Sequence, residues 1–196
     1  RKILEIIENI WRFNDFNLLL EYTFNKSFSD LMKEWKYYYK KQIYPILEEY
    51  DTPSSIAKQV TKRGINASPV VNPNDNEIFF LTNRMGYSDI YSKILNTTHN
   101  AKIVLKGERS AHLESLHLLS SNLDIKGDEL LVSAKSGDSD AINILDVNSR
   151  KIKNSIQFPS IVTISSPKWN LKKTKIVFSG SSWNGNRDIY FYDLKN

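Results

Sequence analysis

The stretch GYSDIY (residues 86–91) recurs near the end of the chain as GNRDIY (residues 185–190). In both copies a glycine stands three positions before Asp-Ile-Tyr. Glycine adopts positive φ angles at little steric cost, and an Asp in a turn accepts hydrogen bonds from nearby backbone amides. The repetition therefore predicts one hairpin that is built twice. The predicted structural turn positions are Gly86, Asp89, Gly185 and Asp188.

The similarity extends well beyond these hairpins. Residues 68–95 and 166–194 both begin with Ser-Pro, continue with an apolar run and end after Asp-Ile-Tyr. Residues 120–147 form a weaker copy, in which Asp140 takes the aspartate slot as a further turn position. The three aspartates are separated by 51 and 48 positions. Repeats of this length that hold several short strands are typical of β-propeller blades, so the sequence predicts a mainly β chain with about three four-stranded blades.

Each unit divides into short strands bounded by turn residues. In the first unit they are expected at residues 66–71, 77–83, 88–95 and 102–106. The last of these, KIVLKGE from residue 102, is echoed by KQVTKRG from residue 58. Residues 56–62 are therefore expected to form an outer strand of a blade that is otherwise absent from the chain.

Residues 1–50 follow a helical pattern, because the apolar residues of RKILEIIENIW recur at the spacing of one helical face. Ser27 and Asp30 have the form of a capping box, and Pro45 is expected to kink the helix or start a new turn. DTPSS at residues 51–55 ends the pattern. The expected domains are a helical segment at 1–52, the end of an upstream domain, and incomplete propeller blades at 56–196, divided near 56–108, 109–158 and 159–196.

Composition favours a folded protein and excludes several classes. Apolar residues make up 40% and charged residues 25% of the chain, which suffices for a packed core. Without cysteine there is no disulfide, thiolate metal site or cysteine nucleophile. The net charge of +5 comes from scattered lysines rather than a basic stripe, which speaks against nucleic-acid binding. No apolar run is long enough to span a bilayer, and the start lacks a signal-peptide cleavage site.

The repeats resemble the TolB-like propeller repeats, also called WD40-like or PD40 repeats. The family pattern runs Ser-Pro-x-Trp-Ser-Pro-Asp-Gly, an apolar strand, a Gly turn and Asp-Ile-Tyr before Asp-Leu. SPKWN (residues 166–170) and RDIYFYDL (187–194) match it well, NPNDNEIFF (72–80) carries a degraded turn, and the middle repeat departs most. The resemblance implies a six-bladed ring and an extracytoplasmic, periplasmic setting. We expect the remaining blades beyond Asn196.

The helical region carries a second, weaker resemblance. YTFNKSFSDLMKEWKYYYKKQIYP (residues 22–45) is similar to the helical tail that follows the catalytic part of some thermolysin-like zinc peptidases, in proteins where a propeller comes next. Such an enzyme needs a His-Glu-x-x-His pair on one helical face, which this sequence lacks. If the resemblance holds, the metal site lies upstream of Arg1.

No residue is predicted to be catalytic, to bind a metal or to hold a cofactor. His112 and His117 flank Glu114 at a spacing that a strand would divide between its two faces, which is a poor metal arrangement. The Gly- and Ser-rich loops lack the patterns of phosphate loops and of serine hydrolases. Aromatic residues and Arg are favoured at the centres of protein interfaces. The candidate contacts on the loop face are Arg84, Tyr87, Trp183, Asn184 and Arg187.

Two functions remain open from the sequence. The first is a binding or scaffold module for protein or peptide partners that has no catalytic activity of its own. The alternative is the accessory propeller of a multidomain peptidase, a zinc metallopeptidase or a serine hydrolase, whose catalytic residues lie outside this chain. Under either reading we expect a protein or peptide partner, no nucleic acid and no transmembrane segment in this part.

Overall fold

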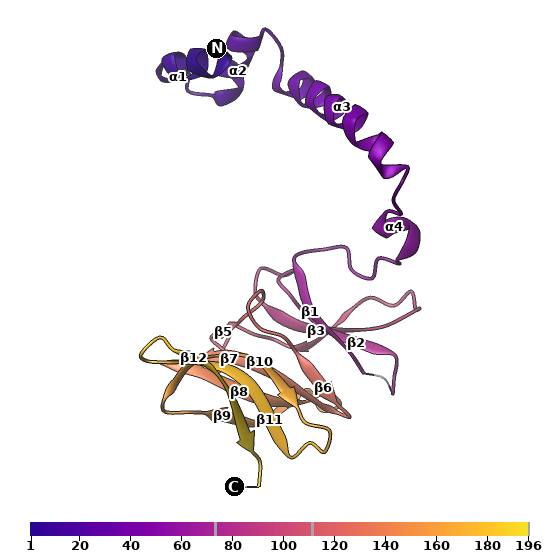
Figure 1. Cartoon of the computed structure of the whole chain (residues 1–196), viewed down its shortest axis with the longest axis vertical. Helices are drawn as coiled ribbons and strands as arrows, with labels where there is room; N and C mark the ends of the chain where they lie inside the picture. The colour runs from indigo at the N-terminus through magenta and orange to yellow at the C-terminus, as the bar shows by residue number, and fades with distance from the viewer. Residues whose placement is uncertain (73, 111, 196) are drawn as a thin grey trace. The chain divides into compact units, whose positions relative to one another are not determined.

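The computed structural model describes residues 1–72, 74–110 and 112–195. The chain divides into two compact units, Arg1–Gln59 and Val60–Asn196. The first is helical and the second consists of antiparallel sheets (Figure 1). The prediction of a mainly β chain, a partial propeller preceded by helices, is confirmed. None of the helices in the described part has both the length and the apolar character needed to cross a lipid bilayer.

The helical unit holds four α-helices and one 3₁₀ turn. They are α1 (Lys2–Asn9), η1 (Ile10–Arg12), α2 (Phe16–Phe24), α3 (Phe28–Leu47) and α4 (Pro53–Ile56). The expected capping box is present at α3, where the Ser27 hydroxyl accepts a bond from the Asp30 amide at 3.2 Å and donates to the Asp30 carboxylate at 2.8 Å. Pro45 lies inside α3, which continues to Leu47, because a proline disturbs mainly the turn before it.

Apolar residues of the helical unit are mostly exposed. Only Leu19, Leu20 and Thr23 are buried among its described residues. The apolar face of α1, predicted from its spacing, points outward with Ile3 and Ile7 more than half exposed. Helices of this size derive most of their stability from packing such faces, so this unit buries little of its own apolar surface.

The β unit is built from three sheets, which we call blades 1, 2 and 3. Blade 1 contains β1 (Asn66–Asn72), β2 (Glu77–Thr82), β3 (Asp89–Ile94) and β4 (Lys102–Leu105) in that order. Blade 2 contains β5 (Ser115–Leu116), β6 (Asp124–Lys126), β7 (Glu129–Ser136), β8 (Ser139–Asp146) and β9 (Lys151–Gln157). Blade 3 contains β10 (Ile161–Trp169), β11 (Lys175–Ser182) and β12 (Arg187–Asp193). All pairings are antiparallel, and both β5 and β6 pair with β7 as a divided inner strand.

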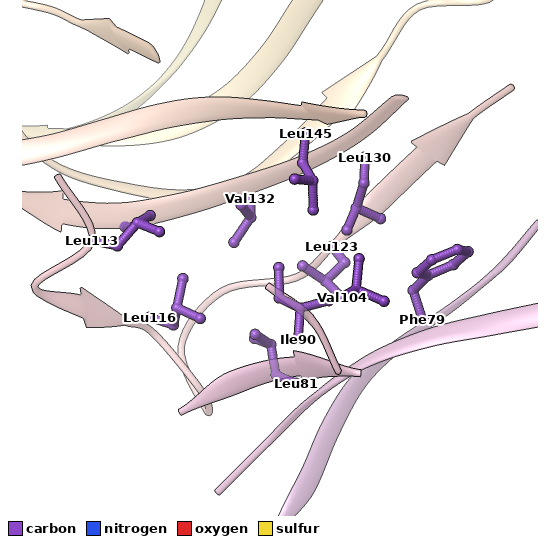
Figure 2. Packing of buried hydrophobic residues seen from close by; sticks show 11 residues of the cluster. Phe79, Leu81, Ile90, Val104, Leu113, Leu116, Leu123, Leu130, Val132 and Leu145 are labelled. Atoms are coloured by element: carbon purple, nitrogen blue, oxygen red, sulfur yellow. The ribbon is translucent and has the colours of Figure 1, made fainter. Parts of the chain in front are cut away.

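The core lies between successive blades. Phe79, Leu81 and Ile90 of blade 1 pack with Leu130 and Val132 of blade 2 (Figure 2). Neighbouring side chains of a strand point to opposite faces, so blade 2 meets blade 3 through the alternate residues. That second cluster includes Leu131, Ile142, Ile144, Ile161, Ile164, Ile176 and Phe178. Burying each of these side chains contributes about 2 kcal/mol.

Two sequence predictions about the blades need correction. Residues 57–62 do not form the expected outer strand, and Ile56 ends α4 instead. A strand needs a hydrogen-bonded neighbour, and the described part of the chain offers this segment none. Pro73, part of the expected turn motif, lies outside the described residues.

The middle copy also aligns differently from the prediction. The sequence places Asp140-Ala141-Ile142 in the Asp-Ile-Tyr slot, so Ala141 is expected to face the neighbouring blade as Ile90 does. In the structure Ile142 faces the following blade instead. The hairpin of blade 2 has only two residues between the paired Ser136 and Ser139, whereas blade 1 has six between Thr82 and Asp89. The shorter turn shifts the side-chain alternation by one position.

Candidate functional site

The hairpins between the second and third long strands of each blade gather at one edge of the β unit, which we call the hairpin edge. It comprises residues 83–88, 137–138 and 183–186 together with the crossover residues 106–110, 112–114 and 158–160. The Glu114 amide donates to the Lys135 carbonyl at 2.9 Å, and the Gln157 side chain donates to the Ser136 carbonyl at 2.7 Å. The first bond ties the crossover from blade 1 to the hairpin end of β7, and the second ties the end of β9 to the same hairpin, both within blade 2.

Asp89 binds the crossover that leads to blade 2. Its buried carboxylate accepts bonds from the Gly107 amide at 3.0 Å and from the Arg109 guanidinium at 3.2 Å. The bond to Asp89 raises the pKa of Arg109 above its ordinary value. A Cβ on Gly107 would lie 2.2 Å from the Ser88 carbonyl oxygen, so only glycine allows this approach. The Asp89 bonds thus reach a segment 18 to 20 residues away rather than the amides of its own hairpin.

Asp140 joins blade 2 to blade 3. One carboxylate oxygen accepts a bond from the Ile164 amide of β10 at 2.7 Å, and the other lies 2.9 Å from the His117 Nε2 atom. Asp140 and Ile164 are both buried. This carboxylate therefore holds three segments together, two from blade 2 and one from blade 3.

Asp188 and the turn glycines complete the predicted turn positions. Asp188 is the second residue of β12, is exposed, and has no hydrogen-bond partner for its carboxylate among the described residues. Gly86 and Gly185 adopt φ angles of 88° and 81°, in the region that favours glycine. Gly137 does the same in the short hairpin of blade 2 with a φ of 67°. The backbone conformations agree with a turn role, which remains a prediction for each residue.

The two candidate contact residues of blade 1 are held by stacking. The Arg84 guanidinium lies 4.6 Å from the Tyr91 ring centre and donates to the Asn66 side chain at 3.2 Å. Tyr87 is 49% exposed and is covered on one face by the Arg109 guanidinium at 4.5 Å from its ring centre. Tyr87 thus remains half-exposed, whereas Arg84 is turned toward the sheet.

The three candidates of blade 3 lie on the last hairpin. Trp183 is 65% exposed, and its indole N–H donates to the Pro159 carbonyl at 3.3 Å. Arg187 donates to the hydroxyls of Ser179 and Ser165. Asn184 is exposed. The hairpin of blade 2 separates this group from Arg84 and Tyr87, so the structure brings the candidates to one edge but not into one cluster.

Sequence reasoning missed the partners of the aspartates. Gly107 and Arg109 belong to the stretch KGER (residues 106–109), which follows β4 directly. His117 lies in a segment with no regular strand pattern. The only signal in the sequence was the recurrence of an aspartate at the same place in each repeat. Among the described residues, no group of three His, Asp or Glu side chains is placed to hold a metal ion.

No family model and no curated protein matches this sequence. Solved structures do match it. TolB from Acinetobacter baumannii aligns with a TM-score of 0.54 and 18% identity over 70% of this chain and 32% of that chain. A putative TolB from Agrobacterium tumefaciens aligns with a TM-score of 0.55 and 15% identity over 71% of this chain and 47% of that chain.

A puromycin-hydrolyzing peptidase from Mycobacterium tuberculosis aligns with a TM-score of 0.51 and 12% identity over 67% of this chain and 20% of that chain. The chain therefore spans 20% to 47% of the length of these three proteins. At such low identity the likeness concerns the fold alone. The strand region of this chain has the fold of a partial TolB-like β-propeller.

Proposed function

We propose that the β unit is a binding and scaffold module that contacts a protein or peptide at the hairpin edge and performs no catalysis on its own. The observation that supports this most is the pair of exposed aromatic side chains, Tyr87 and Trp183, each fixed by a polar neighbour at that edge. A pre-positioned aromatic loses little conformational entropy on binding, which favours its use as an anchor.

The test is peptide selection followed by titration. Peptides selected from a display library against the full chain are labelled with fluorescein and titrated with the protein while fluorescence anisotropy is recorded. We expect the Trp183→Ala variant to bind at least about tenfold more weakly, which is the loss of affinity typical when an interface anchor is truncated to Ala. Leu171→Ala is the matched control, since Leu171 is 89% exposed on the opposite, β10–β11 loop of the same blade. Equal binding by the wild type and Trp183→Ala would refute the proposed site.

A second candidate is an accessory propeller of a multidomain peptidase, either a zinc metallopeptidase or a serine hydrolase. Support comes from the likeness in fold to the puromycin-hydrolyzing peptidase and from the resemblance of residues 22–45 to a zinc-peptidase tail. In this case the catalytic residues belong to another domain. A peptidase assay on the purified chain should then show no turnover, and a full-length protein with peptidase activity that falls when residues 56–196 are deleted would favour this candidate over the first.

The likeness in fold to TolB supports three finer features of the proposal. They are a ring of six blades, an extracytoplasmic, periplasmic location, and a division of the chain into a helical segment at 1–52 and blades at 56–196. Fractionation of cells that express the full-length protein checks the location. Limited proteolysis checks the division, with first cleavage expected near residues 51–62, where the described chain has only the short helix α4.

A further inference from the structure

The inner strands of the three blades all depart from regular pairing at corresponding places. β1 and β10 each carry a bulge, and the bulges fall on the two Ser-Pro pairs of the repeat, Ser68-Pro69 and Ser166-Pro167. In blade 2 the inner strand is interrupted by residues 117–123, which separate β5 from β6. Hydrogen bonds join these three irregular segments, so the blades are linked along their inner strands as well as at the hairpin edge.

The backbone at both bulges is strained. Ser68 and Ser166 adopt φ angles of 53° and 54°, in the left-handed region that crowds the Cβ atom of an L-residue. A residue before proline also favours extended conformations, so the Ser-Pro pairs carry two unfavourable features. Strained backbone persists only where the surrounding contacts hold it in place. The contacts of the two serines therefore indicate what stabilises the bulges.

Both bulges are held by Ser121 of blade 2. Its carbonyl accepts a bond from the Ser68 hydroxyl at 2.6 Å, and its hydroxyl accepts a bond from the Ser166 amide at 3.0 Å. The Ser121 hydroxyl also lies 2.6 Å from the Ser133 hydroxyl of β7. Because the Ser166 amide only donates, the Ser121 proton is free to bond to Ser133. Ser121 and Ser133 are buried, so each lost bond leaves a buried polar group without a partner.

A single residue thus bonds to groups in all three blades. Asp89 and Asp140 each serve one joint, blade 1 to blade 2 and blade 2 to blade 3 respectively. Ser121 serves both joints, through its carbonyl on one side and its hydroxyl on the other. These two groups belong to one residue in a segment without regular strand pairing, so they move together when that segment moves.

We propose that Ser121 couples the two joints, so that loosening of blade 1 is transmitted to blade 3. When the Ser68 bond breaks, the Ser121 carbonyl is released and residues 117–123 shift. The Ser121 hydroxyl then leaves the Ser166 amide, and the strained bulge of β10 loses its support. All of the bonds involved lie within blades 1 to 3.

Amide hydrogen exchange of the full chain, followed by nuclear magnetic resonance, tests the coupling. Ser68→Ala removes the hydroxyl bond to Ser121 and should speed exchange about fivefold in β2 of blade 1, the change expected for one hydrogen bond. Exchange in β11 of blade 3 should rise by a comparable factor. Gly86→Ala is the matched control, because it destabilises blade 1 at its hairpin turn rather than at Ser121 and should leave β11 unchanged.

Ser121→Ala separates the two joints. This substitution keeps the carbonyl that binds Ser68 but removes the hydroxyl that accepts the Ser166 amide. In this background Ser68→Ala should still speed exchange in β2 but should no longer change it in β11. Ser133→Ala is a milder second variant, because it leaves Ser121 intact and removes only the partner of its proton. The β11 response to Ser68→Ala should shrink in that background too.

Three results would overturn the proposal. The first is a β11 strand that does not respond to Ser68→Ala when Ser121 is present. The second is an equal β11 response to Gly86→Ala, which would mean that any loosening of blade 1 reaches blade 3. The third is a β11 response to Ser68→Ala that persists undiminished in the Ser121→Ala and Ser133→Ala backgrounds.

Discussion

Asp140 offers the sharpest test of how the blades are joined. Its carboxylate accepts the Ile164 amide of blade 3 at 2.7 Å and lies 2.9 Å from His117 Nε2 of blade 2. Asp140→Ala removes both bonds and puts no other acceptor in their place. The Ile164 amide is buried, so water does not compensate for the lost bond.

The expected cost follows from these two bonds. A hydrogen bond to a charged group is worth about 2 kcal/mol, and a buried donor left without a partner costs about as much again. We therefore expect Asp140→Ala to lower the free energy of unfolding of the β unit by about 3 kcal/mol. Asp140→Asn keeps one carbonyl oxygen for the Ile164 amide and should cost about 1 kcal/mol.

Urea denaturation and amide hydrogen exchange measure the effect globally and at the joint. The Ile164 amide should exchange faster in Asp140→Ala by more than the amides of β2 in blade 1, because blade 3 is released first. Asp138→Ala is the matched control, since Asp138 is exposed on the same hairpin two residues earlier. If Asp140→Ala were as stable as Asp138→Ala, or if Ile164 stayed equally protected, the inter-blade role of this carboxylate would be wrong.

Three further predictions concern the interior, a turn and the acid range. Asn143→Leu should raise the free energy of unfolding by about 1 kcal/mol, because the side-chain amide of buried Asn143 has no hydrogen-bond partner within the described structure. The urea midpoint should rise accordingly, and a lower midpoint would contradict this. Gly86→Ala should cost about 1 kcal/mol, since φ is 88° there and no atom crowds the added methyl group, and an unchanged thermal midpoint would argue against the strained turn. A hydrogen bond from Lys153 lowers the pKa of Asp146 below its ordinary value. The ionised Asp146 carboxylate therefore contributes its full stabilisation above the ordinary carboxylate pKa near ~4, and this stabilisation is lost as the pH falls toward the lowered pKa. Urea midpoints measured against pH should accordingly fall less steeply in acid for Lys153→Gln than for the wild type, and parallel curves would refute the coupling.

Much of the fold could be predicted because its signals are local. Turn glycines, β-branched runs and a fifty-residue repeat mark the strands of blade 1 to within a residue or two, as the expected 102–106 and the observed Lys102–Leu105 illustrate. The capping box at Ser27 was equally readable, since all of its atoms come from one turn of chain. The predicted strand at 56–62 failed because a strand depends on a neighbour that local sequence does not supply.

The candidate site was predicted less completely. The sequence singled out Asp89 and Asp140 but assigned their bonds to the nearby turn, whereas Gly107, Arg109 and Ile164 supply the partners from 18 to 24 residues away. The spacing of residues along the chain does not show which crossover contacts which hairpin. The sequence also did not show the one-residue shift in blade 2. Asp140 aligns with Asp89 in the repeat, but the residues that follow the two aspartates alternate between the sheet faces in opposite order.

By itself the sequence determined that tandem four-stranded units follow a helical segment, since periodicity and turn chemistry act between residues that are neighbours in the chain. The tertiary structure alone decided which faces are buried and which aspartates join blades. Both depend on contacts between residues remote in sequence. It also decided the partners of β3 and β8, which each pair with an outer strand of their own blade, whereas within the described residues β12 pairs with β11 alone.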